Sequence, residues 1–324
     1  YSSAASDVYK RQILVLDTAT AAVRASVSVP CYDPEHLADS LQAENSPFLN
    51  RALQSYAVGS VFKPVLAATA LEAGLQPVFE CTGAVVVDGQ IFRCAGGVPH
   101  GQVDLAAALE KSCNGYFIRL GQQLGAESLL DAAKAFGFGQ SLLLAEGFAA
   151  EAGQLPTPQE LAQSGQLANF SFGQGSLLAT PMQVAALFNT LAADGVYRAP
   201  YVLQATLDEA TGQPVETLSH PRGRRVISAQ NAALLRAMLV QVVQQGTAQD
   251  AAGLSGGAGG KTGTAQTGQF TPEGTERCNL WFAGFWPAEK PRYTIVVLQD
   301  GAVHTAYSGA AIFAQVCTAL EAAG

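Results

Sequence analysis

The sequence predicts a mixed α/β protein of the α+β type, with an antiparallel sheet built from N- and C-terminal strands. Two observations support this fold class. Segments typical of strands lie at both ends of the 324-residue chain, and segments typical of helices lie between them. We therefore expect one sheet flanked by helices, an inserted all-helical lobe, and a functional cleft between the sheet and the lobe.

The bulk composition indicates a globular chain and makes some partners unlikely on physical grounds. Apolar residues make up 48% of the sequence and charged residues 14%, which is typical of a folded protein with a sizeable core. The net charge is −8 and there is no long basic block, so no nucleic acid is expected as a partner. No apolar run in the sequence approaches the roughly 20 residues that span a bilayer.

The first twelve residues are set apart from the rest of the chain. The stretch "DVYKRQ" resembles one translated frame of a sequencing-library adapter. We therefore expect residues 1–12 to be non-native and take residues 13–324 as the predicted domain. On this interpretation the native N-terminus, with any anchor, is not part of the sequence.

The N-terminal half begins with two predicted strands. "ILVLD" is apolar, "VRASVSV" alternates every second residue, and the short turn "TATAA" joins them. After a polar loop, "AVGSVFKPVLAATALEAG" (residues 57–74) predicts a buried helix that ends near Gly74. Ser60 and Lys63 lie near its start. A buried lysine costs free energy unless it has partners, so Lys63 calls for a functional explanation.

Further helices and strands complete the predicted order. "VDLAAALEKSCNGYFIRLGQQLG" predicts two helices that are broken at residues 112–115, with Asp104 as the cap of the first. Three more helices are predicted in "AESLLDAAKAFG", "TPMQVAALFNTLAADG" and "AQNAALLRAMLVQVVQQG", with residues 137–179 as a connection. The segments "GGKTGTAQTG", "NLWFAGFWP" and "RYTIVVLQDG" supply the C-terminal strands, and "AAIFAQVCTALEA" the last helix.

The six cysteines show neither a CxxC pair nor a Cys/His spacing typical of a metal site, so no metal is expected. Cys81 and Cys94 flank "GAVVVDGQIFR", a predicted hairpin that turns at Asp88-Gly89. Two alternatives stay open for this pair: a disulfide, if the protein is exported, and two free buried thiols.

Two short motifs have candidate chemistry around a serine. Ser60 and Lys63 are three residues apart, so on a helix they share one face. A lysine whose pKa is depressed by burial could take the proton of the serine hydroxyl. Ser112 and Asn114 lie at the predicted helix break, where a hydroxyl and an amide could relay a proton and hold a substrate amide. Alone, each pair also fits a solvated helix face or an ordinary turn.

The third motif is Lys261-Thr262-Gly263-Thr264, at the start of a predicted strand. The lysine and the threonine hydroxyls could bind a carboxylate, and Gly263 would leave room for a substrate backbone. The backbone N–H of Thr264, with that of Ser60, could form an oxyanion hole. A strand start flanked by glycines is the ordinary alternative for this stretch.

Together, the three motifs occur once each and in the order that is the signature of penicillin-binding proteins and class A β-lactamases. The sequence resembles the transpeptidase domain of a class B penicillin-binding protein over nearly all of residues 13–324. The segments that carry the resemblance are "SPFLNRALQSYAVGSVFKP", "HGQVDLAAALEKSCNGYF", "SFGQG", "TPMQVA", "GGKTGTAQTG" and "LWFAGFWP". Val58 and Val61 stand where family members often have Pro and Thr, a difference that could alter the acylation rate or the affinity for β-lactams.

The resemblance implies a peptidoglycan D,D-transpeptidase that crosslinks stem peptides ending in D-Ala-D-Ala and is acylated by β-lactam antibiotics. It implies no metal and no organic cofactor. The residues that it assigns to the site are Ser60 as nucleophile, Lys63 as general base, Ser112 and Asn114 as proton-relay and substrate-amide groups, and Lys261, Thr262, Gly263 and Thr264 on the carboxylate and oxyanion side.

The resemblance also implies a place in the cell. The native protein would face outward from the bacterial cell membrane, held by an N-terminal anchor and a pedestal domain missing from this sequence. It would work beside a glycan-polymerising partner protein. His100 fits a family turn and would have a structural role. Separately from the resemblance, we expect the side chain of Cys113, which lies between Ser112 and Asn114, to point into the helical lobe.

Two alternatives to a transpeptidase are kept. The first is a serine β-lactamase or D,D-carboxypeptidase, in which water resolves the acyl-enzyme; Glu146 and Glu151 are the nearest candidates for a deacylating carboxylate. The second is of another class, a β-lactam sensor or a cell-wall binding module.

Overall fold

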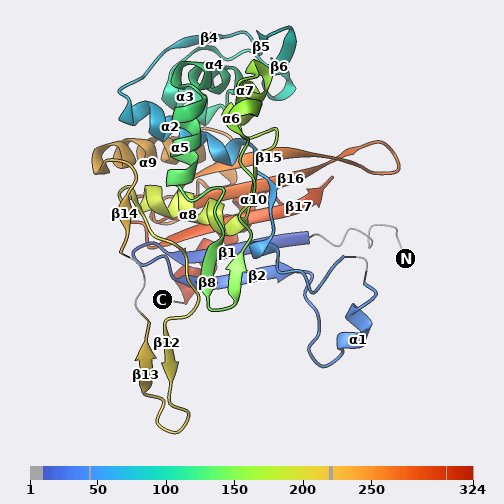
Figure 1. Cartoon of the computed structure of the whole chain (residues 1–324), viewed down its shortest axis with the longest axis vertical. Coiled ribbons are helices and arrows are strands. Elements are labelled where there is room, and N and C mark those ends of the chain that lie inside the picture. Colours follow the sequence, from blue (N-terminus) through green and yellow to red (C-terminus); the bar gives the residue numbers. More distant parts are fainter. Residues whose placement is uncertain (1–9, 44, 219–221, 304, 324) are drawn as a thin grey trace.

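The computed structural model describes residues 10–43, 45–218, 222–303 and 305–323. Its centre is a five-stranded sheet with the strand order β15-β16-β17-β1-β2, in which all neighbours are antiparallel (Figure 1). The strands of this sheet are β1 (Lys10–Asp17), β2 (Val23–Val29), β15 (Gly259–Phe270), β16 (Glu276–Trp286) and β17 (Tyr293–Ala302). The prediction of one antiparallel sheet built from the two ends of the chain is confirmed.

Strand β1, near the start of the sequence, pairs with β17, near its end, and this pairing joins the N- and C-terminal strands into one sheet. Lys10 lies opposite Asp300 and Asp17 opposite Tyr293. The expected non-native segment overlaps this strand, because residues 10–12 form its first three positions, whereas residues 1–9 lie outside the described part of the chain. The non-native origin of residues 1–12 stays a prediction.

The two faces of the sheet have different neighbours. Successive side chains of a strand point to opposite faces, and in β16 the neighbours Trp281 and Phe282 show this. The Trp281 Nε1–H donates to the carbonyl oxygen of Ala57 at 2.9 Å, near the start of the lobe. The ring of Phe282 packs edge-on against Phe313 of α10 (Gly309–Ala322), with centroids 4.7 Å apart. Helix α10 therefore covers the face away from the nucleophile segment.

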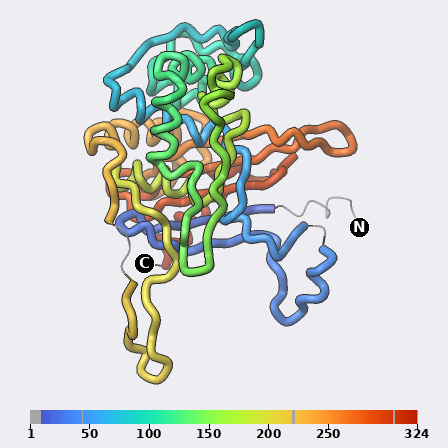
Figure 2. Tube along the Cα trace, viewed as in Figure 1, coloured from blue at the N-terminus to red at the C-terminus, as the bar shows by residue number. Residues whose placement is uncertain are grey.

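The helices of the lobe lie side by side on one side of the sheet (Figure 1). Figure 2 shows that they come from the part of the chain between the terminal strands. These helices are α2 (Lys63–Glu72), α3 (Leu105–Glu110), α4 (Asn114–Leu124), α5 (Ala126–Ala135), α6 (Pro158–Leu161) and α7 (Ser164–Ser171). Helix α9 (Ala229–Gln244) contacts α2, α3 and β15, and every residue of α8 (Pro181–Ala192) is buried. The predicted inserted lobe is confirmed, but it is not all-helical, because two short strand pairs lie beside its helices (Figure 1), namely β4 (Phe79–Cys81) with β7 (Gly101–Val103) and β5 (Ala84–Val87) with β6 (Gln90–Arg93).

Residues 137–179 contain more structure than the predicted connection. They hold β8 (Leu142–Ala145), β9 (Phe148–Ala150) and β10 (Leu178–Ala179), besides α6 and α7. The prediction was wrong there because these elements are too short to show a clear period. One signal was readable: Thr157 and Glu160 form a capping box at the start of α6.

The predicted hairpin between Cys81 and Cys94 is confirmed. Strands β5 (Ala84–Val87) and β6 (Gln90–Arg93) pair through a two-residue turn in which Asp88 and Gly89 both have positive φ. The remaining short elements are α1 (Leu37–Ser40), η2 (Arg51–Leu53), β3 (Tyr56–Ala57), η3 (Gly59–Phe62), β4 (Phe79–Cys81), η4 (Ala95–Gly97), β7 (Gly101–Val103), β11 (Val196–Tyr197), β12 (Ala205–Leu207), β13 (Pro214–Thr217), β14 (Arg224–Arg225) and η5 (Gln249–Ala251). Among the described residues, no helix has the length and apolarity that crossing a bilayer requires.

Candidate active site

Ser60 lies in a 3-10 turn rather than in a continuous α-helix. The turn η3 (Gly59–Phe62) leads directly into α2, of which Lys63 is the first residue. Pro64 suits this position because the first turn of a helix does not need its N–H. The sequence therefore placed the helix correctly, but missed the tighter turn that carries the serine.

Lys63 is fully buried and makes three polar contacts across the lobe. Its Nζ lies 2.8 Å from the carbonyl oxygen of Ser112, 3.2 Å from Ser112 Oγ and 2.7 Å from Asn114 Oδ1. Burial lowers the pKa of Lys63 to about 7, because an ammonium loses its hydration in such a site. Near neutral pH, a substantial share of the Lys63 side chains is therefore a neutral amine, which can accept a proton.

The turn between α3 and α4 carries both partners of Lys63. Asp104 caps α3, as predicted, by accepting from the N–H of Ala107 at 2.8 Å. Ser112 has a φ of +52°, a left-handed conformation that costs a residue with a side chain free energy. The Asn114 Nδ2–H donates to the carbonyl oxygen of Arg93 at 2.9 Å, which leaves Asn114 Oδ1 for Lys63. The predicted break between the two helices is confirmed, but it covers residues 111–113 rather than 112–115, because Asn114 and Gly115 already begin α4 behind the cap at Cys113.

The third motif forms part of β15, the edge strand beside η3. Thr262 and Thr264 line the cleft, whereas Lys261 and Gly263 are buried behind it. Burial, and then the positive charge of Lys63, hold the pKa of Lys261 well below its usual value. The Lys261 Nζ donates to the carbonyl oxygen of Thr262 at 3.2 Å.

Gly263 has a neighbour other than the expected substrate backbone. A Cβ at Gly263 would lie 3.0 Å from Val61 Cγ1 and 3.2 Å from the carbonyl oxygen of Val58. These atoms belong to the segment that carries Ser60. The glycine thus lets β15 approach the nucleophile turn closely, and the space beside it is filled by the chain itself.

The "SFGQG" segment supports the nucleophile turn from the other side. The N–H of Gly59 donates to the carbonyl oxygen of Gly173 at 2.8 Å. A Cβ on Gly173 would lie 2.0 Å from the Gly59 carbonyl oxygen, and one on Gly59 would lie 2.7 Å from the Thr264 carbonyl oxygen. Three backbone segments therefore meet at distances that only glycine allows.

The motifs meet in one cleft of about 780 Å³, a size that suits a small peptide ligand. Ser60, Ser112, Asn114, Thr262 and Thr264 line this cleft. The sequence reasoning missed the other polar lining residues, which are Arg93, Asn169, Gln174, Thr247 and Gln266. Gln174 lies inside the "SFGQG" segment and Gln266 inside "GGKTGTAQTG", which are the available signals for these two residues. None of the described residues that line the cleft is an aspartate or a glutamate.

The cysteines require a correction. Cys81 and Cys94 are free thiols in the structure, with their sulfurs 3.7 Å apart. The sequence analysis found no Cys/His ligand pattern, yet the fold brings these two residues together with His100 and Cys113. The four residues are spread over 33 positions of the chain from four short segments, so no standard spacing revealed them. As expected, Cys113 points into the interior of the lobe and is fully buried.

Comparison with known proteins identifies the family. The model of the penicillin binding protein transpeptidase domain matches residues 12–318. The peptidoglycan D,D-transpeptidase PbpA of Mycolicibacterium smegmatis is 32% identical over 334 residues, which cover 96% of this chain and 66% of the relative. Stage V sporulation protein D of Bacillus subtilis is 31% identical over 89% of this chain and 45% of its own length.

Solved structures agree with this assignment. The D,D-transpeptidase domain of a peptidoglycan glycosyltransferase from Eggerthella lenta has a TM-score of 0.87 at 28% identity and covers 98% of this chain and 79% of its own. A ceftriaxone acyl-enzyme complex of penicillin-binding protein A from Mycobacterium tuberculosis has a TM-score of 0.86 at 27% identity, over 97% of this chain and 74% of its own. The fold and the three motifs define a serine acyltransferase-type cleft. The chain belongs to the penicillin-binding protein transpeptidase family, and it spans about two-thirds or less of these two curated relatives.

The close approach at Gly173 can be tested by Gly173→Ala. The added Cβ would meet the Gly59 carbonyl, so we expect a loss of about 1–3 kcal/mol in unfolding free energy beyond the cost of the positive φ. Gly268→Ala is the matched control, because Gly268 has a φ of +69° and nothing within 4 Å of its Cβ position. Denaturant unfolding of both variants measures the difference. Equal losses would contradict the packing described here.

Proposed function

We propose that this domain is a serine D,D-transpeptidase in which Ser60 is acylated by a peptidoglycan stem peptide. The observation that carries the proposal is the single cleft in which the Ser60 hydroxyl lies beside the Ser112–Asn114 turn, with the buried Lys63 amine behind both. The family assignment supports the same reaction class, since the relative from M. smegmatis is a peptidoglycan D,D-transpeptidase.

The contacts of Lys63 suggest how protons move. A neutral amine has two N–H groups and one lone pair. The carbonyl of Ser112 and Asn114 Oδ1, at 2.8 and 2.7 Å, suit the two N–H groups. Ser112 Oγ lies 3.2 Å from the same nitrogen and accepts from it when Lys63 is an ammonium, so a proton can pass from Lys63 to Ser112. Ser60 lines the same cleft as Ser112, and in the proposed reaction the lone pair of the neutral Lys63 amine accepts the proton of the Ser60 hydroxyl.

Acylation then follows a balanced sequence. Ser60 Oγ attacks the carbonyl carbon between the two terminal D-alanines as its proton passes to Lys63. Ser112 donates a proton to the departing amine of D-alanine and recovers one from Lys63. The acyl-enzyme is resolved by an amine from a neighbouring stem peptide, which loses a proton by the reverse route.

The β15 side of the cleft would hold the substrate. β15 is an edge strand, so its unpaired backbone groups can bind an extended peptide as an added strand. Thr262 and Thr264 line the cleft, and we expect their hydroxyls to donate to the terminal carboxylate, that of Thr262 from beside the Thr247 hydroxyl at 2.7 Å. The backbone N–H groups of Ser60 and Thr264 are the proposed oxyanion hole.

The alternative in which a carboxylate activates water to resolve the acyl-enzyme finds no aspartate or glutamate among the described residues that line the cleft. Neither Glu146 nor Glu151 is among the described residues that line it. A carboxylate oxygen of Glu151 instead accepts from the backbone N–H of Ser55 at 2.9 Å. This favours an amine over water as the acyl acceptor.

The proposal extends to the cellular setting. Peptidoglycan lies outside the cytoplasmic membrane, so the domain would act on the outer side. An N-terminal anchor and a glycan-polymerising partner protein belong to the same proposal.

Labelling with a fluorescent penicillin tests the nucleophile. The wild-type chain should form a stable adduct that peptide mapping places on Ser60, and Ser60→Ala should form none. The control Ser255→Ala removes an exposed serine hydroxyl outside the cleft and should label normally. Incubation with a D-Ala-D-Ala peptide and an acceptor amine then separates a transpeptidase from a sensor, because a sensor would give no crosslinked product. A mapped adduct elsewhere than Ser60 would contradict the proposal.

The pH dependence of acylation tests the base. The pKa of Lys63 is lowered to about 7, so the neutral amine prevails above that pH and the ammonium below it. The acylation rate should therefore rise about tenfold per pH unit below about 7 and level off above it. Stopped-flow measurement with benzylpenicillin gives this profile. A rate that still climbs toward pH 10 would mean that Lys63 keeps an ordinary pKa.

A further inference from the structure

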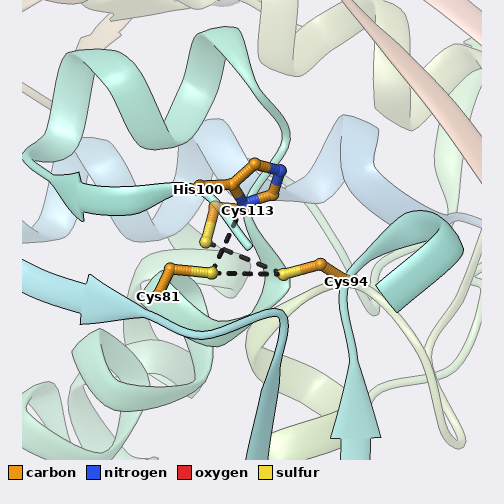
Figure 3. Close-up of side chains that lie close together, drawn as sticks. All are labelled: Cys81, Cys94, His100 and Cys113. Atoms are coloured by element: carbon orange, nitrogen blue, oxygen red, sulfur yellow. Dashed lines mark hydrogen bonds between the residues drawn. The ribbon is translucent and has the colours of Figure 1, made fainter. Parts of the chain in front are cut away.

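Four side chains with metal-binding atoms converge beside the cleft. Cys81 ends β4, Cys94 follows β6, His100 precedes β7, and Cys113 lies in the turn between α3 and α4. Figure 3 shows the three sulfurs and the imidazole pointing toward one another. Each residue offers one ligand atom, and all four atoms lie within 4.8 Å of one another.

The separations do not fit covalent bonds between the sulfurs. Cys81 Sγ and Cys94 Sγ are 3.7 Å apart, and Cys94 Sγ and Cys113 Sγ are 3.8 Å apart. A disulfide needs about 2.05 Å. Three sulfurs grouped in this way are also more than one disulfide can use. The cluster therefore calls for another explanation than the disulfide left open by the sequence.

The same separations match the edges of a tetrahedron around zinc. With Zn–S bonds of about 2.3 Å and Zn–N bonds of about 2.0 Å, tetrahedral angles place two sulfurs about 3.8 Å apart and a sulfur and a nitrogen about 3.5 Å apart. The two sulfur–sulfur distances are 3.7 and 3.8 Å, and Cys81 Sγ lies 3.4 Å from His100 Nδ1. Since no ligand pair exceeds 4.8 Å, small side-chain movements would close the tetrahedron.

The surroundings suit a closed site of thiolates. Cys81, Cys94 and Cys113 are at most 5% exposed, so bulk water has little access to the sulfurs. Cys113 caps the N-terminus of α4, and its sulfur accepts from the N–H of Tyr116 at 3.4 Å. A helix N-terminus and an N–H donor both stabilise a thiolate, and three thiolates with one imidazole form a ligand set that selects zinc over hard cations.

We propose that Cys81, Cys94, His100 and Cys113 bind one Zn²⁺ in a tetrahedral structural site. The thiols release their protons as the Zn–S bonds form. All four positions of the ion are filled by the protein, so the ion has no vacant site for substrate or water.

The metal would hold the turn that carries the partners of Lys63. Cys113 lies between Ser112 and Asn114, and Cys94 follows Arg93, whose carbonyl accepts from Asn114 Nδ2. A Zn²⁺ ion bound by both Cys94 and Cys113 would fix the backbone on each side of the hydrogen bond between Asn114 and Arg93. It would also hold Ser112 in its left-handed conformation, which is not otherwise favourable. The metal site stands without the proposed function, whereas this positioning role rests on it.

Metal content and acylation are measured together on the whole chain. After dialysis of reduced protein against zinc and then metal-free buffer, mass spectrometry of the metal should give about one zinc per chain. Cys81→Ala should lose this zinc and lower the melting temperature, and Cys317→Ala should keep it. Cys317 is the matched control because it is a buried free cysteine outside the cluster. Cobalt substitution should give the visible spectrum of a tetrahedral thiolate site in the wild type and in Cys317→Ala, and should not in Cys81→Ala.

The outcomes separate the metal site from the proposed function. We expect Cys81→Ala, folded by circular dichroism, to be acylated by penicillin at least about tenfold more slowly than Cys317→Ala. Equal rates would overturn the positioning role. Folded wild-type protein without zinc, or with a disulfide between two of the four residues by mass, would overturn the metal site. If zinc binds but Ser60 is never acylated, the proposed function fails and the metal site stands.

Discussion

The burial of one amine, that of Lys63, is the constraint on which the rest of the site depends. An amine removed from water must find partners within the fold. Here the partners are Ser112 and Asn114, which come from the inserted lobe, while Lys63 begins the helix that follows the Ser60 turn. The same contacts that make burial tolerable join α2, the helix that follows the nucleophile turn, to the residues between α3 and α4. Positioning of the reactive groups and packing of the two parts are therefore one requirement.

On the sheet side of the cleft, glycines allow the Ser60 turn to approach the backbone of β15 and of residue 173 closely. Gly59 and Gly173 lie where backbone segments approach more closely than a side chain would permit, and a Cβ at Gly263 would lie only 3.0 Å from Val61 Cγ1. The edge strand β15 can then lie against the Ser60 turn and present Thr262 and Thr264 to the cleft. The family motifs thus combine two kinds of residue, reactive groups and the small residues that let those groups come together.

The periodicity of long segments made much of the fold predictable. The terminal strands, the helix after Ser60 and the break between α3 and α4 follow from alternation, apolar runs and turn residues. The short elements between residues 137 and 179 do not span enough residues to show a period. The 3-10 turn at Ser60 is fixed by packing against β15 and Gly173, which no local pattern records.

The candidate site also has one part that the sequence could predict and one that it could not. Its reactive residues could be named because each lies in a compact motif whose order along the chain is informative. The cluster of Cys81, Cys94, His100 and Cys113 could not, because its members are brought together only by the hairpin and by the turn between two helices. Only the fold shows that Cys81, Cys94 and His100 lie beside Cys113, which directly precedes Asn114 in the sequence. A zinc ion there would add a second fixed point to the turn that Lys63 holds.

The most direct test is to measure the pKa of Lys63 itself by an NMR titration. Lysine labelled with ¹³C at Cε would be followed with pH, and Lys63→Arg would identify its signal. The account predicts a midpoint at about 7, because burial lowers the pKa of Lys63. A midpoint near the ordinary value of about 10.4 would contradict it, since Lys63 would then be an ammonium at neutral pH and no base for Ser60.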